Sequence, residues 1–341
     1  MSLKIKNSRI ILSNFSKISS NCSKRFYSSD ESPYPTSKSK SGSTSTSGSK
    51  SSDKLTIPRQ KTLHDIYKMY SKKEPISVIT AHDYITGKFA NDSDKIDIVL
   101  IGDSLSMVTM GYPNTLEMEF EEFYYSSKYI LRGIDSKFVI IDLPFGYFEN
   151  SLSKCIETSL KLMKLGKVNS IKLEGSFEYK DEIKRLIDIG IPVTGHIGLK
   201  PQRFNSLGGF KVQGKDTYSA LKIYEEALFL QELGISLLVL ECVPDKIAQY
   251  ITDKLSIPTI GIGAGNGTSG QVLVQGDLLG MMNGKNAKFV KRYSNFYESG
   301  VNAINLYGEE VKFGKFPING EQSYPIKDEE FENFIKLADK L

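Results

Sequence analysis

Five residues that can bind a metal ion or move a proton stand where apolar, strand-like runs of the sequence end: Asp103, Asp142, Glu174, His196 and Glu241. A strand that is buried on both faces cannot carry a charge in its middle without a large desolvation cost. At the C-terminal end of the strand, the same charge can face a cleft. Because several strands of one chain end in this way, we expect their ends to converge on one site, which indicates an enzyme.

Three of these residues are carboxylates without a His or Cys at metal-binding spacing: Asp103, Asp142 and Glu174. Oxygen ligands of this kind favour a hard cation such as Mg²⁺ over Zn²⁺. Lys172 lies two residues before Glu174 on the same strand, so the two side chains point to the same face. A cation beside carboxylates and a metal ion is suited to anchoring an anionic substrate.

Each of these assignments has a structural alternative. Lys172 and Glu174 could form a buried ion pair, and Asp142 could serve as a turn residue after its strand. Asp103 and Ser104 could cap the segment that follows them. The position that they share at strand ends favours the functional interpretation.

Glu241 and His196 are candidates for proton transfer. Glu241 follows an apolar run, and a carboxyl that is partly removed from water is a better base near neutrality. It could also pair with a neighbouring helix N-terminus. His196 could be a second acid–base group or a core histidine bonded to backbone, and the sequence leaves both open. The glycine-rich loop 261–267 follows the seventh strand-like run, where barrels often bind phosphate, although glycines also serve tight turns.

Strand-like runs alternate with helical patterns over about 250 residues of the chain. The runs are 76–80, 96–102, 138–142, 170–173, 193–196, 237–241, 258–261 and 271–274. The clearest helical patterns are 119–132, 151–165, 179–188, 217–233 and 245–255. This alternation predicts parallel βαβ units and a (β/α)₈ barrel, whose active site lies at the C-terminal strand ends. An open doubly wound sheet fits less well, because residues on five strands would not all reach one crevice.

The first 56 residues are expected to lie outside the barrel. Residues 1–29 are rich in Lys, Arg and Ser and contain no Asp or Glu, which is typical of a mitochondrial transit peptide; an ordinary basic tail is the alternative. Residues 30–56 contain a tract of Ser, Thr, Gly and Lys and are expected to form a disordered linker. The catalytic barrel domain is then expected over residues 57–341.

Composition narrows the class of protein. The formal net charge is +4, but six positive charges precede Asp30, the first acidic residue, which leaves about −2 for the rest of the chain. A slightly acidic body argues against nucleic acid as the main partner. The three cysteines form no CxxC pair, which suits a reducing compartment. No apolar run approaches the roughly 18 residues that span a bilayer, so no membrane partner is expected.

Eight sequence pieces resemble the ketopantoate hydroxymethyltransferase (3-methyl-2-oxobutanoate hydroxymethyltransferase) family of pantothenate biosynthesis, in family order from about Thr62 to Phe313. The pieces are Ile79-Thr80-Ala81-His82-Asp83-Tyr84, Gly102-Asp103-Ser104-Leu105, Asp142-Leu143-Pro144-Phe145, Lys172-Leu173-Glu174-Gly175, Gly195-His196-Ile197-Gly198-Leu199, Gly208-Gly209-Phe210-Lys211-Val212-Gln213-Gly214, Leu240-Glu241-Cys242-Val243-Pro244 and Gly261-Ile262-Gly263-Ala264-Gly265-Asn266. Two departures are His82, where the family usually has Tyr, and Ser106, where it commonly has Gly. Ser106 could crowd the metal loop.

The resemblance implies a TIM-type barrel related to phosphoenolpyruvate mutase. It implies an Mg²⁺ site at Asp103, Asp142 and Glu174, the last through water. It further implies an oxo-acid pocket at Asp103, Ser104, Asp142 and Lys172, with Glu241 as the catalytic base. The implied reaction transfers a hydroxymethyl group from 5,10-methylenetetrahydrofolate to 3-methyl-2-oxobutanoate and gives 2-dehydropantoate. Family members are often decameric, which implies a homo-oligomer.

Two other functions stay open on sequence grounds. One is a related Mg²⁺-dependent enzyme that makes or breaks C–C bonds of an oxo-acid without folate, but the Lys-Lys-Cys-Gly-His motif of the lyase relatives is absent from the sequence. The other is a non-catalytic barrel that serves as a binding protein. The presence of all the candidate site residues argues against this second alternative.

Overall fold

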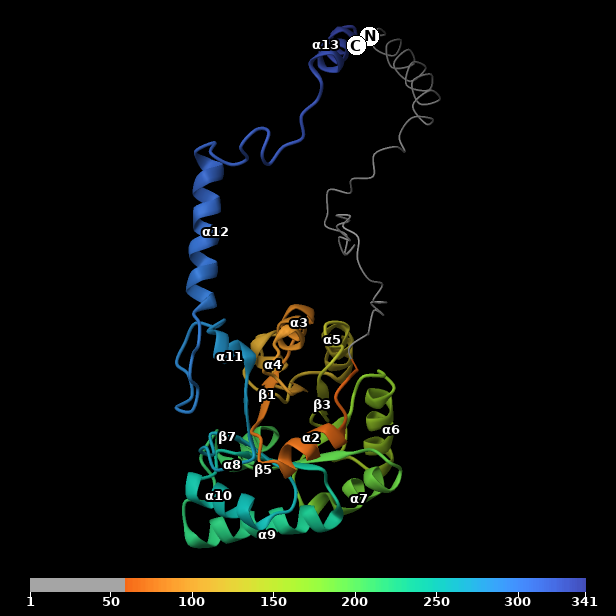
Figure 1. Ribbon diagram of the computed structural model, residues 1–341, viewed down its shortest axis with the longest axis vertical. Coiled ribbons are helices and arrows are strands. Elements are labelled where there is room, and N and C mark those ends of the chain that lie inside the picture. Colours follow the sequence, from red (N-terminus) through yellow and green to blue (C-terminus); the bar gives the residue numbers. More distant parts are fainter. Residues whose placement is uncertain (1–58) are drawn as a thin grey trace, which may run out of the picture. The chain divides into compact units, whose positions relative to one another are not determined.

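The computed structural model describes residues 59–341 and contains one closed barrel of eight parallel strands in sequence order (Figure 1). The strands are β1 (Ile76–Thr80), β2 (Ile98–Ile101), β3 (Phe138–Asp142), β4 (Ser170–Glu174), β5 (Val193–Gly198), β6 (Leu237–Glu241), β7 (Thr259–Ile262) and β8 (Gly270–Leu273). β8 pairs with β1 and closes the ring. The expected (β/α)₈ barrel is therefore confirmed, and the strand ends differ from the expected ones by at most two residues.

Helices follow the strands, and the longer ones pack against the outside of the barrel. They are α3 (Tyr84–Asp92), α4 (Leu105–Val108), α5 (Phe120–Arg132), α6 (Leu152–Met163), α7 (Lys180–Asp188), α8 (Phe204–Leu207), α9 (Thr217–Leu233), α10 (Asp245–Lys254) and α11 (Gln275–Leu279). Short 3₁₀ turns η1 (Phe177–Tyr179) and η2 (Pro201–Arg203) follow β4 and β5. One apolar cluster lies between these helices and the outward-facing strand residues.

A second apolar cluster fills the interior of the barrel, and its members alternate along six of the strands. They are Ile76, Val78, Ile98, Leu100, Phe138, Ile140, Leu237, Val239, Ile260, Ile262 and Val272. Helix α2 (Leu63–Ser71) adds the fully buried Ile66 to this cluster. The strands β4 and β5 contribute nothing to it, because their alternate positions are polar, and Ser170 Oγ lies 2.8 Å from Thr194 Oγ1.

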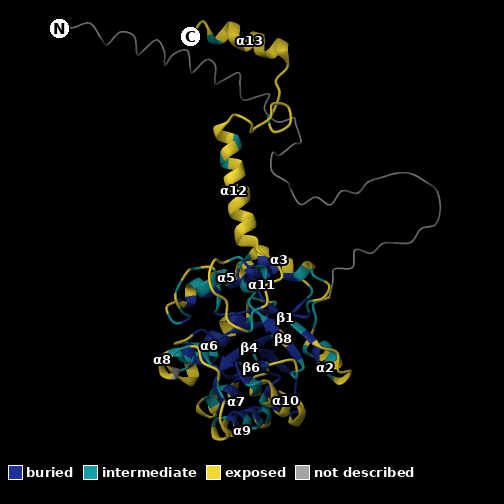
Figure 2. Ribbon diagram, turned by 90° about the vertical axis from the view of Figure 1, so that its left-hand side faces the viewer, coloured by how far each residue is buried: buried dark blue, intermediate teal, exposed yellow. Residues whose placement is uncertain are grey.

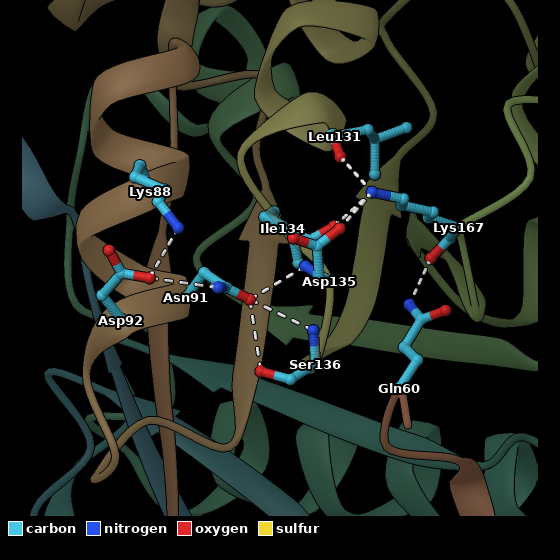
Figure 3. Close-up of polar contacts among 9 residues, drawn as sticks. All are labelled: Gln60, Lys88, Asn91, Asp92, Leu131, Ile134, Asp135, Ser136 and Lys167. Carbon is cyan, nitrogen blue, oxygen red and sulfur yellow. Dashed lines mark hydrogen bonds and ion pairs between the residues drawn. The ribbon is translucent and has the colours of Figure 1, made fainter. Parts of the chain in front are cut away.

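Polar contacts fasten the loops that lead into β3 and β4 (Figure 3). Lys167 Nζ donates to the carbonyl oxygens of Leu131 at 3.0 Å and Ile134 at 2.6 Å. Asn91 Oδ1 accepts from the N–H groups of Asp135 at 2.8 Å and Ser136 at 3.1 Å. These groups lie at the N-terminal ends of the strands. In barrels of this type the active site lies at the opposite, C-terminal ends, so these contacts serve stability.

The chain after α11 contains two further helices, α12 (Phe296–Lys312) and α13 (Asp328–Ala338), and neither contains a buried residue (Figure 2). No helix in the described part of the chain has the length and apolar character to cross a membrane. The expected transit peptide at 1–29 and linker at 30–56 lie outside the described residues.

Candidate active site

On β3 and β6, the site residues follow the apolar side chains that point into the barrel, two positions further toward the C-terminal end. Asp142 continues the inward series of Phe138 and Ile140, and Glu241 continues that of Leu237 and Val239. Because side chains alternate along a strand, both carboxylates project into the mouth of the barrel. On β4 and β5 the polar series runs deeper, through Ser170, Lys172 and Glu174 and through Thr194 and His196. The five strand-end residues therefore converge, as the sequence predicts.

Lys172 and Asp142 form a buried ion pair, with Lys172 Nζ 3.0 Å from Asp142 Oδ1. Apart from this ion pair, Asp142 Oδ1 has no hydrogen-bond partner. The other carboxylate oxygen, Asp142 Oδ2, accepts the backbone N–H of Asp103 at 3.0 Å. Lys172 thus pairs with the carboxylate of the neighbouring strand rather than with Glu174, and the pair also fixes the start of the loop that carries Asp103.

His196 lies between two carboxylates. Its Nδ1 is 3.3 Å from Glu174 Oε1, and its Nε2 is 3.2 Å from Glu241 Oε2. Lys172 Nζ lies 3.4 Å from the same Nδ1. The histidine therefore does not bond backbone, and it connects the inner carboxylate, Glu174, to the outer one, Glu241.

Gln202, in the turn after β5, joins residues from three other strands. Its Nε2 donates to Asp103 Oδ2 at 2.8 Å and to the carbonyl oxygen of Leu143 at 2.9 Å. Its backbone N–H donates to Glu174 Oε2 at 3.1 Å. Sequence reasoning missed this residue, because an amide in a loop carries no chemical signature of its own. Its place in a Pro-Gln pair soon after a strand end is the only available signal.

The charges of the site are unevenly balanced. Burial and the nearby Asp142 and Glu174 carboxylates raise the pKa of Asp103 well above its usual range, although Lys172 and Gln202 act in the opposite direction. Burial acts to lower the pKa of Lys172, but the three surrounding carboxylates outweigh it and raise that pKa. Burial acts to raise the pKa of Glu174, but His196 and Lys172 outweigh it and lower that pKa.

The carboxylates on both sides of His196 favour its protonated form. Burial and the Lys172 ammonium act to lower the pKa of the imidazole, but Glu174 and Glu241 outweigh them and raise it to about 9. The site thus sets two basic side chains, Lys172 and His196, against four carboxyl groups, and Asp103 is the carboxyl group without an ion-pair contact. One further cation beside Asp103 would correct this balance.

The donor set fits a magnesium ion at Asp103 and Asp142. Within residues 59–341, no three His, Cys, Asp or Glu side chains are arranged to hold a metal ion by themselves. Mg²⁺ is commonly held by one or two carboxylates, with water and substrate oxygens completing its shell. The Asp103 carboxylate and Asp142 Oδ1 meet this need, because the Gln202 amide bonds only one oxygen of Asp103 and Asp142 Oδ1 has an ion pair but no hydrogen bond.

The backbone around Glu241 is strained and held from several directions. Cys242, the next residue, adopts a left-handed conformation with φ of 50°, which costs a non-glycine residue energy. Its N–H donates to the Ile262 carbonyl oxygen at 2.8 Å, and its own carbonyl oxygen accepts from Gln213 at 2.9 Å. The Glu241 carbonyl oxygen accepts from Leu199 at 2.8 Å. The position of Glu241 is therefore set by the end of β7 and by the loops that contain Leu199 and Gln213.

The remaining sequence candidates have structural partners. Ser104 is half-buried and starts α4 without a side-chain capping bond. The Ser106 hydroxyl donates to the carbonyl oxygen of Asn114 and ties the following loop. His82 is buried, its Nδ1 has no partner, and burial lowers its pKa despite the opposing charge of Asp83. In the glycine-rich loop, a Cβ at Gly265 would lie 2.5 Å from Asp245 Cβ, so close approach to α10 requires this glycine.

Comparison with known proteins matches these elements to one family. The family model for ketopantoate hydroxymethyltransferase matches residues 60–319. A 3-methyl-2-oxobutanoate hydroxymethyltransferase from Emericella nidulans is 44% identical over 83% of this chain and 82% of its own length. The enzymes of that name from Saccharomyces cerevisiae and Bdellovibrio bacteriovorus are 41% and 45% identical, over 82% and 76% of this chain and 91% and 98% of theirs. The chain belongs to the ketopantoate hydroxymethyltransferase family.

Membership in the ketopantoate hydroxymethyltransferase family confirms the expected enzyme class, a hydroxymethyltransferase of pantothenate biosynthesis. Solved structures confirm the fold. Phosphoenolpyruvate phosphomutase from Streptomyces platensis subsp. rosaceus aligns with a TM-score of 0.50 at 10% identity, over 82% of this chain and 99% of that one. A phosphonopyruvate hydrolase solved with oxalate and Mg²⁺ aligns with a TM-score of 0.50 at 9% identity, over 82% of this chain and 97% of that one. The expected barrel of the phosphoenolpyruvate mutase kind is therefore confirmed.

The His196 contacts predict how stability depends on pH. The folded-state pKa of about 9 exceeds the ordinary value of 6.5, so the contribution of His196 to stability is fully present below pH 6.5. It is lost progressively as pH rises through about 9. In His196→Gln, this loss should be absent. Urea unfolding of the metal-free protein and the variant between pH 6 and 10 checks the prediction, and parallel curves would contradict it.

Proposed function

We propose that this protein transfers a hydroxymethyl group from 5,10-methylenetetrahydrofolate to 3-methyl-2-oxobutanoate, and that Glu241 is the base. The observation that carries this proposal is the exposure of Glu241. Its side chain is 16% exposed, whereas those of Asp142 and Glu174 are 3% and 2% exposed. A base must reach the substrate, and Glu241 combines this access with a place beside His196.

The chain's own residues supply binding and proton transfer. Lys172 offsets the negative charge of the oxo-acid, and Ser104 stands beside Asp103 at the rim of the same pocket. Glu241 accepts the proton from C3 of the substrate, and the resulting carbanion equivalent forms the new C–C bond to the one-carbon unit. Water completes the transfer, which releases 2-dehydropantoate and tetrahydrofolate. His196 Nε2 lies 3.2 Å from the Glu241 carboxylate, on the side of the histidine opposite Glu174.

A divalent cation completes the proposed site. Asp103 and Asp142 would hold Mg²⁺, with Glu174 acting through water. When bound, the ion polarises the keto group of the substrate and stabilises negative charge that develops on its oxygen. The uneven charge balance at Asp103 and the phosphonopyruvate hydrolase solved with oxalate and Mg²⁺ support this part of the proposal.

Replacement of Glu241 by Gln should abolish proton exchange at C3 and leave oxo-acid binding nearly intact. The amide keeps the shape of the side chain but cannot accept the proton, so the rate should fall by roughly 10²–10⁴. Deuterium exchange into 3-methyl-2-oxobutanoate, followed by NMR, measures this step without the complete transfer. The exposed Glu232→Gln on α9 is the matched control and should behave as the native protein. Near-normal exchange in Glu241→Gln would remove Glu241 as the base.

Replacement of Asp103 or Asp142 by Asn should weaken Mg²⁺ binding and oxo-acid binding together. The two ligands share the carboxylates, and the native protein should itself lose oxo-acid affinity when EDTA removes the metal. Calorimetric titration of each variant with Mg²⁺, and then with oxo-acid, measures both affinities. The exposed Asp253→Asn on α10 is the control. Normal oxo-acid binding by either site variant in the presence of EDTA would contradict the shared site.

We also propose mitochondrial localisation. The Lys, Arg and apolar residues of 1–29 have the composition of a transit peptide. This segment should direct a fused reporter to mitochondria, and replacing Arg9, Lys17 and Arg25 by Glu should leave the protein in the cytosol. A chain without residues 1–56 should keep its catalytic rate. Cytosolic localisation of the reporter with the native segment, or loss of activity on truncation, would overturn this assignment.

We further propose a homo-oligomer. Helix α12 carries apolar side chains that are well exposed, among them Val301 at 40%, Ile304 at 70% and Val311 at 46%. An amphipathic helix gains most of its stability from packing its apolar face, which a second copy of the chain can provide. Analytical ultracentrifugation tests this assignment, and a species with the 38.1 kDa mass of one chain would contradict it.

A further inference from the structure

The amide of Gln202 is buried among the charged groups of the site, and the residue as a whole is 4% exposed. Its Nε2 makes two hydrogen bonds, to Asp103 Oδ2 and to the Leu143 carbonyl oxygen. Its Oε1 is buried and has no hydrogen-bond partner. An unpaired buried acceptor costs free energy, so the amide occupies this place at a cost to stability.

Both partners of the amide lie at the ends of other strands. Asp103 follows β2, and Leu143 follows β3, so the amide connects β5 with both. The backbone N–H of the same residue donates to Glu174 at the end of β4. The turn that contains Gln202 therefore bonds two of the three carboxylates predicted to bind the metal ion, Asp103 and Glu174. It bonds only one oxygen of each.

We propose that Gln202 is a positioning residue that orients the Asp103 carboxylate toward the cation and the oxo-acid. By donating to Oδ2, the amide leaves Oδ1 of Asp103 to face the ligand. The amide is a neutral donor, so it adds no charge beside Asp103 while it fixes one of the carboxylate oxygens. This inference rests on the function proposed above and adds a residue that the strand-end pattern does not contain.

The chemistry of the side chain explains why an amide is needed here. A carboxylate in its place would face Asp103 without a donor, and like charges at this distance repel. A shorter Asn would move the amide back by one methylene and lose the contact. A hydrogen bond to a charged group changes an equilibrium by about 10- to 100-fold. We therefore expect Gln202→Glu and Gln202→Ala to weaken cation binding by about this factor.

The test uses the full-length native protein and the two variants, with Mn²⁺ as the probe. Electron paramagnetic resonance of free Mn²⁺ reports binding without catalysis, and steady-state kinetics then separate KM for the oxo-acid from KM for methylenetetrahydrofolate. The proposal expects weaker Mn²⁺ binding, a higher KM for the oxo-acid and an unchanged KM for the folate. Gln231→Glu on α9 is the matched control, because Gln231 Oε1 accepts from Ser256 outside the site. It should bind Mn²⁺ within about twofold of the native protein.

Four outcomes distinguish the possibilities. Native-like Mn²⁺ binding in both Gln202 variants overturns the proposal. A lower melting temperature with unchanged Mn²⁺ affinity also overturns it, because the residue would then only hold its loop. Gln202→Glu keeps the size of the side chain, so weaker Mn²⁺ binding in that variant at a native-like melting temperature supports the positioning role. Absence of transferase activity in the native protein would instead refute the proposed function, whatever the variants bind.

Discussion

The buried ion pair between Lys172 and Asp142 is the interaction on which the rest of the site depends. It places a cation inside the barrel, where an unpaired charge would cost several kcal/mol. The carboxylate partner is used twice, because Asp142 also accepts the backbone N–H of Asp103. The pair thus sets the local charge, and Asp142 also fixes the start of the loop after β2 through the Asp103 N–H. An ion pair of this kind contributes little net stability and much definition of geometry, which is what a binding site requires.

The polar interior of β4 and β5 is the second constraint. Six strands fill the barrel with apolar side chains, whereas these two place Ser170 and Thr194 below Lys172 and His196. The hydroxyls satisfy one another, and Ser170 Oγ also donates to the Pro192 carbonyl oxygen at 3.0 Å. Buried polar groups are tolerated where they are bonded in this way. The active site is therefore built into one side of the barrel core and does not rest on loops alone.

The sequence allowed much of this arrangement to be predicted. Strands such as Phe138–Asp142 are continuous apolar runs that end in a charge, so both their extent and the place of Asp142 follow from desolvation. The contacts among the side chains could not be predicted in this way. The choice of Asp142 rather than Glu174 as the partner of Lys172 depends on the register between β3 and β4, which pairs Asp142 with Lys172. Periodicity within one strand carries no information about that register. The position of Gln202 depends on the geometry of the loop after β5, which sequence patterns define less well than they define strands.

The left-handed backbone at Cys242 brings backbone groups of three other segments into hydrogen-bonding distance of Glu241 and Cys242. Ile262 ends β7, and Leu199 and Gln213 lie in the segments after β5 and α8; each is bonded to Glu241 or Cys242 through backbone atoms. These bonds use backbone atoms, so they do not depend on which side chains stand at the three positions. The neighbouring Gly198 cannot be replaced in the same way, because a Cβ there would lie 2.3 Å from the Glu241 carbonyl oxygen. The position of the reacting carboxylate is therefore set by backbone geometry and a neighbouring glycine rather than by the side chains that surround it.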